Sequence, residues 1–147
     1  MKYILTTLTV LSIGVAVSVT AFGAASASSS IGVRRTQLGR VLVDGRGRTL
    51  YLFERDKADK SNCSSGCLAV WRALTASTRP HARAGITNSK IGTIRRADGR
   101  RQVTYAKHPL YYYAGDTKPG DTNGQGLNQF GAKWYVLSPT GRKIDND

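Results

Sequence analysis

Residues 50–56, Leu-Tyr-Leu-Phe-Glu-Arg-Asp, and residues 110–116, Leu-Tyr-Tyr-Tyr-Ala-Gly-Asp, repeat one pattern. Each copy has a Tyr, an aromatic residue two positions later and an Asp three positions after that. Because side chains alternate between the two faces of a β-strand, the Tyr and the second aromatic residue of each copy lie on the same face. The pattern therefore predicts two aromatic β-strands, each followed by an acidic residue.

The same neighbours flank both copies in the same order. An Asp-Gly turn precedes each copy, and a polar loop and a Trp follow it. These flanking residues are Asp44-Gly45 and Trp71 for the first copy, and Asp98-Gly99 and Trp134 for the second. Internal repetition of this kind predicts two related units, at about residues 39–74 and 91–137, that share one core.

The size and composition of the chain indicate one compact domain. It has 147 residues, of which 40% are hydrophobic and 21% charged, and these values are typical of globular proteins rather than of disordered or fibrous ones. Further β-rich segments bounded by turn residues occur at 40–44, 48–53, 91–94, 102–105 and 133–137. Residues 67–74 contain no Gly or Pro and predict a helix of about two turns. The predicted fold class is mainly β: a single small domain of two related β-hairpin units with one short helix near 67–74.

The first 27 residues have the pattern of a secretory signal peptide. Lys2 provides a positive end, residues 4–25 are apolar and uncharged, and small residues follow at a cleavage position. An uncleaved membrane anchor is the alternative, because the apolar stretch is long enough to span a bilayer. No Cys precedes Cys63, so we expect no lipid attachment. The expected organisation is a signal peptide at 1–27, an N-terminal linker at 28–38, the repeat domain at 39–143 and a loose tail at 144–147.

The candidate site residues of the two motifs are Tyr51, Phe53, Asp56, Tyr111, Tyr113 and Asp116. We favour a structural interpretation, in which the four rings pack together and each Asp accepts hydrogen bonds from the turn that follows it. A stacking platform for a sugar ring or a cation, with the carboxylates at its edge, is a second interpretation. A hydrolase is the third, and it requires the two carboxyl groups to face each other across about 5–10 Å.

Cys63 and Cys67 are the two cysteines of the chain. In an exported protein such a pair usually forms a disulfide. Residues four apart in an α-helix have Cβ atoms about 5–6 Å apart, which is too far for a disulfide, so the bond requires a turn between the cysteines. Ser65 is suited to cap the helix that follows this turn. A thiol-redox site, or a copper or zinc site that includes His108, is the alternative.

Basic residues outnumber acidic ones by 22 to 9, which gives a formal net charge of +13. The four arginines that surround the Asp98-Gly99 turn are Arg95, Arg96, Arg100 and Arg101. Positive charge of this size attracts polyanions, and outside the cytoplasm these are anionic envelope polymers or lipid head groups. Nucleic acid is a less suitable partner, because the sequence has an export signal and no nucleic-acid-binding motif. We expect no cofactor.

The chain resembles a bacterial family of secreted or lipid-anchored proteins that is named for the repeated Tyr-x-(Phe/Trp/Tyr)-x-x-Asp motif. The resemblance covers residues 39–141 and rests on the two motifs, on the Cys-x-x-x-Cys pair followed by Trp71, and on segments 108–111 and 120–126. The chain has Trp-Arg-Ala-Leu at 71–74, where the family often has Trp-Pro-Pro-Leu, and it lacks the lipid-attachment Cys of many members. Because the family has no defined activity, the resemblance implies a fold and an exported location only.

The predicted function is therefore that of an exported, non-catalytic binding or structural module of the cell envelope, which contacts anionic polymers through its Arg-rich loops. The alternative is an extracytoplasmic redox or metal-handling protein that uses Cys63, Cys67 and His108. A hydrolase that uses Asp56 and Asp116 is the third hypothesis.

Overall fold

The computed structural model describes residues 30–146, and the predicted signal peptide lies outside this part of the chain. Within these residues the fold is mainly β, as predicted, with a single short α-helix. The elements are β1 (Ser30–Thr36), β2 (Gly39–Asp44), β3 (Tyr51–Phe53), α1 (Gly66–Val70), β4 (Trp71–Ala73), β5 (His81–Ala82), the 3-10 helix η2 (Asn88–Lys90), β6 (Ile91–Arg95), β7 (Arg101–Tyr105), β8 (His108–Pro109), β9 (Tyr111–Tyr113), β10 (Asn128–Gln129) and β11 (Ala132–Val136).

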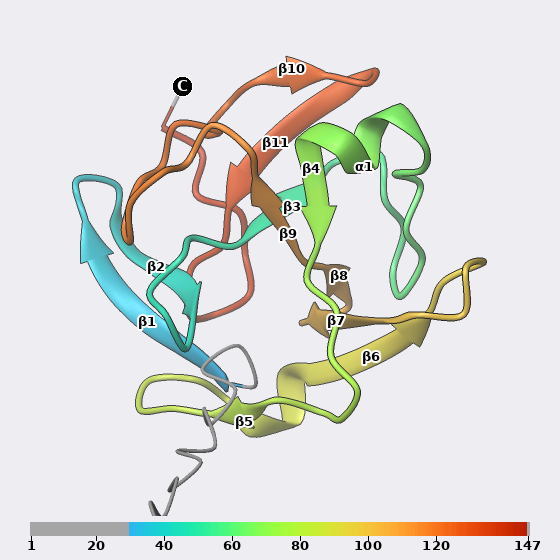
Figure 1. The fold of residues 1–147 in the computed structure, drawn as a ribbon. Coiled ribbons are helices and arrows are strands. Elements are labelled where there is room, and N and C mark those ends of the chain that lie inside the picture. Colours follow the sequence, from blue (N-terminus) through green and yellow to red (C-terminus); the bar gives the residue numbers. More distant parts are fainter. Residues whose placement is uncertain (1–29, 147) are drawn as a thin grey trace, which may run out of the picture.

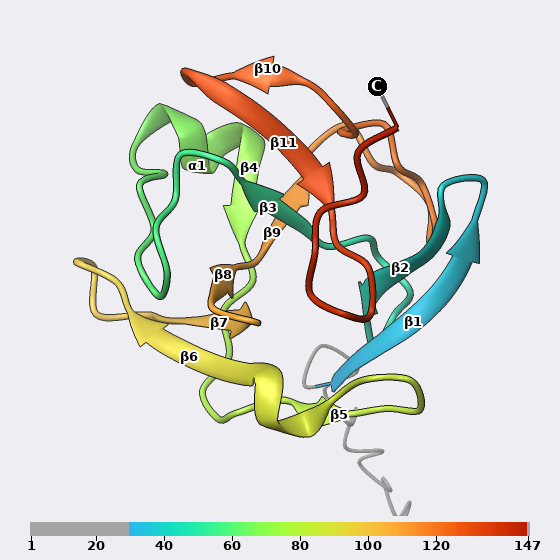
Figure 2. The ribbon, with the colours of Figure 1, turned by 180° about the vertical axis from the view of Figure 1, so that it is seen from behind.

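The strands form three sheets (Figure 1). The central sheet has five strands in the order β10-β11-β3-β9-β4, and the other two sheets have three strands each, in the orders β2-β1-β5 and β6-β7-β8. The two views in Figures 1 and 2 agree that β10 lies at one end of the molecule and β5 at the other. The β1–β2 pair lies along one side of the central sheet.

The two motif strands are neighbours at the centre of the molecule. β3 and β9 are antiparallel, and Tyr51 of the first motif is opposite Tyr111 of the second. The Trp that follows each motif pairs with the strand of the other motif: Trp71 on β4 pairs with β9, and Trp134 on β11 pairs with β3. The two units therefore exchange strands, and an approximate two-fold axis passes through the Tyr51–Tyr111 pair.

The first unit begins earlier than the sequence predicts. Residues 28–38 are predicted to be a linker, but β1 lies within them and pairs with β2 from Ile31 to Thr36. Ile31 of β1 is fully buried and packs in the core. The linker prediction is wrong because the apolar pattern of Ile31 and Val33 is too short to indicate a strand. Pairing with β2 and burial of Ile31 stabilise β1 instead.

One of the two predicted hairpins is complete. β6 and β7 are antiparallel on either side of the Asp98-Gly99 turn, as predicted. The hairpin predicted over residues 40–53 forms at its turn only, where Val43 is opposite Thr49. Beyond this bridge β3 does not pair with β2. It lies in the central sheet instead, where it pairs with β11 on one edge and with β9 on the other.

The predicted helix near 67–74 is confirmed only in its first half. α1 ends at Val70, and residues 71–73 form β4. Trp71 is fully buried and its backbone pairs with Tyr113. Helix propensity is a weak preference, and here sheet pairing and burial of the indole ring override it.

The predicted loose tail is anchored at its first residue. The main-chain N–H of Ile144 donates to the carbonyl of Val136 at 2.9 Å, and the side-chain amide of Gln125 donates to the carbonyl of Ile144 at 2.6 Å. Ile144 also packs against the core beside β11. The chain is therefore held to the domain at least as far as Ile144.

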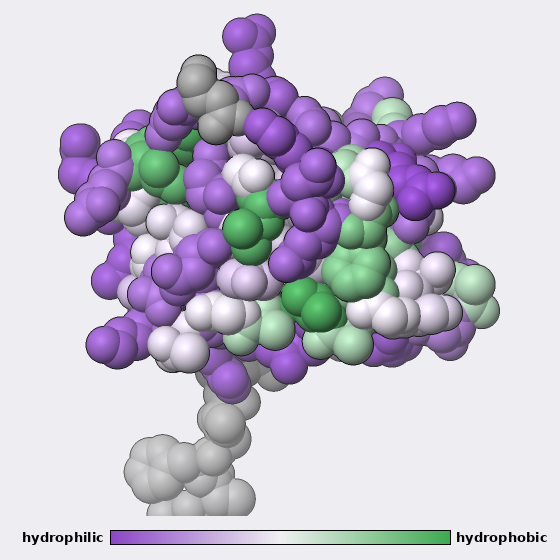
Figure 3. Space-filling view, turned by 90° about the horizontal axis from the view of Figure 1, so that it is seen from above, coloured by the Kyte–Doolittle hydropathy of each residue, from purple (hydrophilic) through white to green (hydrophobic). Residues whose placement is uncertain are grey.

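The two faces of the central sheet carry two hydrophobic clusters. One face gathers the motif rings and the two tryptophans, and the other gathers mainly aliphatic residues around Leu52 and Tyr112. Figure 3 shows the β10 end, where hydrophilic side chains cover much of the surface and hydrophobic colour is confined to small separate areas. Within residues 30–146, Phe130 is the exposed large hydrophobic side chain, and no helix is long and apolar enough to cross a membrane.

Candidate functional site

Two crossed hydrogen bonds join the motifs. The hydroxyl of Tyr51 donates to the carboxylate of Asp116 at 2.7 Å, and the hydroxyl of Tyr111 donates to the carboxylate of Asp56 at 2.7 Å. Each Tyr therefore binds the Asp of the other motif. The motif spacing cannot predict this pairing, because it depends on how β3 and β9 are placed next to each other in the sheet.

An Asn in each following loop completes the arrangement. The main-chain N–H of Asn62 donates to Asp56 at 2.6 Å, and its side chain donates to the carbonyl of the preceding Arg55 at 2.7 Å. Asn123 makes the two equivalent contacts around Asp116, at 2.9 and 3.3 Å. These asparagines are not among the residues predicted from the sequence. The available signal was an Asn six or seven residues after each motif Asp.

Burial controls the ionisation of these groups. It raises the pKa of Asp56 to about 6, although hydrogen bonds and the charge of Arg96 lower it. Burial also raises the pKa of Asp116, and it raises the pKa of Tyr51 and of Tyr111 well above the usual value for a phenol. Both tyrosines are therefore neutral hydrogen-bond donors at neutral pH.

The aromatic rings form a continuous stack. The ring centroids of Phe53 and Trp134 are 4.1 Å apart, those of Trp134 and Trp71 are 3.9 Å apart, and those of Trp71 and Tyr113 are 4.5 Å apart. Phe53 and the two tryptophans are at most 2% exposed, whereas Tyr113 at the end of the stack is partly exposed. The motif rings thus lie in one packed cluster, as the structural interpretation predicts, and a ligand can reach the stack at Tyr113.

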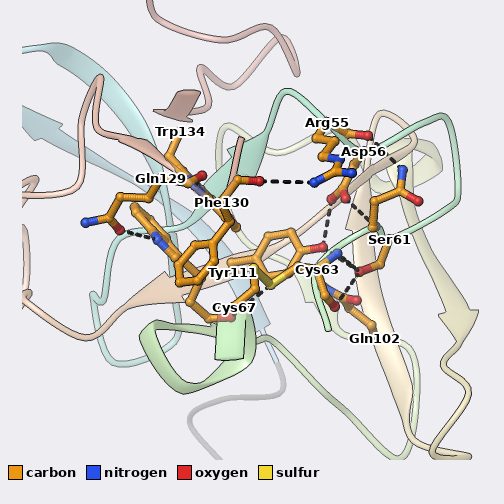
Figure 4. The surroundings of a disulfide bond; sticks show 12 residues. Arg55, Asp56, Ser61, Cys63, Cys67, Gln102, Tyr111, Gln129, Phe130 and Trp134 are labelled. Atoms are coloured by element: carbon orange, nitrogen blue, oxygen red, sulfur yellow. Dashed lines mark hydrogen bonds between the residues drawn. A yellow bond between two sulfur atoms is a disulfide. The ribbon is translucent and has the colours of Figure 1, made fainter. Parts of the chain in front are cut away.

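Cys63 and Cys67 form a disulfide, as predicted. Figure 4 shows this bond beside the ring of Tyr111 and below the loop that carries Asp56. The predicted cap at Ser65 is absent: its side chain makes no capping hydrogen bond, and the helix begins instead with main-chain hydrogen bonds such as that from Cys67 to the Ser64 carbonyl. The disulfide thus fixes the loop between the first motif and β4.

The residues of the redox and metal alternative are not brought together. Both sulfur atoms belong to the disulfide, and His108 on β8 lines a hollow that includes Asp56 but neither cysteine. Burial lowers the pKa of His108. In the part of the chain that the structure describes, no three His, Cys, Asp or Glu side chains gather as a protein metal site requires.

Of the four arginines around the β6–β7 turn, Arg96 differs from the other three. Its guanidinium group points inward, where it donates to the carbonyl of Cys63 at 2.6 Å and to the hydroxyl of Ser61 at 3.0 Å. Arg96 therefore fastens the hairpin to the loop after the first motif. The sequence predicts Arg96, together with the other three, to be a polyanion contact, but the structure places it apart from them, because its guanidinium group is bonded to the loop that ends at Cys63.

The other three arginines line a hollow of about 420 Å³ on the outside of the hairpin. Arg95 and Arg101 are opposite each other on β6 and β7. Arg100 forms an ion pair with Asp98 at 2.7 Å, and Arg101 donates to the carbonyl of Ser77 at 3.2 Å. The structure therefore brings three of the four predicted polyanion contacts to one place.

A family profile matches residues 32–75 and 92–138, which together make up more than half of the chain. The chain belongs to this family, which is described as a secreted repeat of unknown function. The resemblance seen in the sequence is confirmed. The first matched segment of this secreted repeat protein runs from β1 through β4 and the second from β6 through β11, so the matches correspond to the two units that exchange strands. No curated protein and no solved structure matches the chain.

Proposed function

We propose that this secreted repeat protein is a non-catalytic module of the cell envelope that binds anionic surface polymers through the β6–β7 hairpin. The observation that supports this function best is the hollow lined by Arg95, Arg100 and Arg101. Guanidinium groups bind phosphate and carboxylate oxygens in a bidentate manner, so a cluster of them suits repeated anionic groups.

Two of these arginines are available to a ligand. Asp98 offsets the charge of Arg100, while Arg95 and Arg101 donate to main-chain carbonyls, of Gly99 and Ser77, each at 3.2 Å. These carbonyls carry no net charge, so a phosphate or carboxylate group is a stronger partner for both guanidinium groups. The net charge of +13 adds long-range attraction for polyanions.

The test is the binding of purified poly(glycerol phosphate) to the protein at several salt concentrations. The double substitution Arg95→Glu with Arg101→Glu removes the hairpin site. The matched control is Arg35→Glu with Arg40→Glu, because these two arginines are opposite each other on β1 and β2 and carry the same charge change. We expect the hairpin variant to bind about tenfold more weakly or worse and with less dependence on salt, and the control to lose less than about threefold.

Equal losses in the two variants would contradict the proposal, because they would show that net charge alone attracts the polymer. Absence of binding by the unmodified protein at low salt would contradict it as well. Arg96 is left unchanged in both variants, since it holds the hairpin in place and its removal would confuse a loss of binding with a loss of structure.

A further inference from the structure

A second basic hollow lies at the edge of the central sheet, where β4 and β9 meet the loops that follow β2 and the second motif. Its volume is about 260 Å³, and its lining includes Arg46, Arg72, Lys118, Tyr112 and Tyr113. None of its lining residues belongs to the hollow of the β6–β7 hairpin. The observations that follow therefore concern a separate site.

The floor of this hollow is built by a buried network. Asp44 is fully buried, forms an ion pair with Arg48 at 2.7 Å and accepts a hydrogen bond from the hydroxyl of Tyr112 at 2.9 Å. The guanidinium group of Arg48 lies 4.0 Å from the centre of the Tyr112 ring. These contacts hold the aromatic floor in a fixed position and satisfy the charge of Arg48.

The remaining cations of the hollow have no such partner. Within residues 30–146, the side chains of Arg46 and Arg72 make no hydrogen bond and no ion pair, and the guanidinium carbon of Arg72 lies 5.6 Å from the centre of the Tyr112 ring. The ammonium group of Lys118 also makes no hydrogen bond there, although its charge helps to lower the pKa of Asp121. Cations that surround a concave surface without carboxylate partners form a site for an anionic group.

The two carboxylates nearby are already engaged. Asp116 accepts hydrogen bonds from the hydroxyl of Tyr51 at 2.7 Å and from the main-chain N–H of Asn123 at 2.9 Å. Asp121 accepts from the main-chain N–H groups of Thr117 and Lys118, each at 2.9 Å. Asp116 lines both hollows, and the hydrogen-bond donors that surround these carboxylates offset part of their repulsion of an anion there.

A neighbouring hollow extends this site toward α1. It also has a volume of about 260 Å³, and Leu68 and Val70 of α1 form its other wall. The residues that it shares with the first hollow are Arg72, Tyr112, Tyr113 and Asp116. The two hollows make a groove. At one end Arg46, Arg72 and Lys118 surround a largely apolar lining that includes Tyr112, and the other end has a mixed polar and apolar lining. Tyr113, the exposed end of the aromatic stack, lies where the two hollows meet.

We propose that this groove binds a sugar phosphate, with the phosphate group between Arg46 and Arg72 and the sugar ring against Tyr113. The cationic end matches the phosphate, and the mixed end matches a sugar, which presents both hydroxyl groups and an apolar ring face. Each hollow, at about 260 Å³, is slightly smaller than the range of about 300–1,000 Å³ typical of small-ligand sites, so a sugar phosphate would occupy both hollows together. This inference rests on the proposed function only for its setting outside the cytoplasm, since it uses none of the hairpin arginines.

The experiment measures binding of two probes, free glucose 1-phosphate and a poly(hexosyl phosphate), to the full mature protein. We expect Arg72→Gln to weaken the binding of at least one probe about tenfold or more, since a charge-assisted contact is lost. The control Arg35→Gln changes an exposed arginine on β1 outside both hollows, and we expect it to have no effect. The probe that responds identifies the source of the sugar phosphate as a free molecule or a polymer unit.

Three results would overturn the inference: no binding of either probe, equal binding by the Arg72→Gln variant, or equal binding of inorganic phosphate or glucose alone. Since Arg72 is exposed and makes no hydrogen bond within the described residues, its substitution leaves the fold intact. The variant with Arg95→Glu and Arg101→Glu separates the two sites. We expect it to keep its affinity for glucose 1-phosphate even if the hairpin proves not to bind polymers.

Discussion

The contacts of the Tyr51 hydroxyl allow us to predict how much stability the protein loses when this hydroxyl is removed. This hydroxyl donates to Asp116 at 2.7 Å and accepts the N–H of the buried Gly124 at 3.3 Å. A hydrogen bond to a charged group contributes about 1.5–3 kcal/mol to stability, and a buried N–H left without a partner costs about 1–3 kcal/mol. Because Asp116 is only half-buried, water can partly replace the lost donor, so the low ends of both ranges apply. We expect Tyr51→Phe to lower the free energy of unfolding by about 2–3 kcal/mol.

Tyr113→Phe is the matched control for this measurement. Tyr113 is an aromatic residue of the same cluster, but its hydroxyl makes no hydrogen bond to any described residue. Its removal should change the free energy of unfolding by no more than about 0.5 kcal/mol. Urea unfolding followed by the fluorescence of the stacked Trp71 and Trp134 measures both values. Similar losses for the two variants would refute the assignment of the Tyr51 hydroxyl.

A double-mutant cycle then tests which Asp the hydroxyl binds. Tyr51→Phe combined with Asp116→Asn should show a coupling energy of about 1–3 kcal/mol, because the two side chains are in direct contact. Tyr51→Phe combined with Asp56→Asn should show a coupling near zero, because Asp56 is bound by Tyr111 instead. The opposite result would refute the crossed pairing of the motifs.

The remaining predictions also concern stability. Arg96→Gln should lower the free energy of unfolding by about 2–4 kcal/mol, because it removes the charge-assisted hydrogen bonds from Arg96 to the Cys63 carbonyl and to the Ser61 hydroxyl. Arg95→Gln should change it by less than about 0.5 kcal/mol, and equal effects of the two substitutions in urea unfolding would contradict this. Burial raises the pKa of Asp56 in the folded protein to about 6, above the value of about 3.9 for an exposed Asp, so the folded protein holds this proton more tightly than the unfolded chain does. Stability should therefore fall by about 1–3 kcal/mol as pH rises from about 4 to 7. Asp56→Asn should reduce that fall and leave the part that is due to Asp116, whose pKa burial also raises. An unchanged pH profile would show that Asp56 does not cause the fall.

Local sequence patterns predicted the elements whose signal lies within a few residues. The aromatic alternation of residues 50–56 and 110–116 predicted two strands with their rings on one face, and both strands are present. The disulfide between Cys63 and Cys67 followed from their spacing and the predicted export signal. The β6–β7 hairpin followed from its Asp-Gly turn. In each case, backbone geometry and nearby residues were sufficient.

Long-range pairing decided the rest. Trp71 lies in a segment with good helix propensity, but in the structure it is part of strand β4. The reason is Tyr113, more than forty residues later, whose backbone pairs with Trp71 and whose ring packs on the indole. The sequence predicts Arg96 to be a surface charge, but in the structure its guanidinium group points inward and donates to the carbonyl of Cys63.

The sequence by itself determined that the chain has two aromatic repeats, a mainly β fold, a short disulfide loop and a strongly basic character. Only the tertiary structure decided that the repeats exchange strands, that Tyr51 binds Asp116 rather than Asp56, and which arginines are paired with a carboxylate. The reason is physical: a burial pattern shows which side chains turn inward, but the partner of a hydrogen bond or an ion pair depends on which distant segments pack together.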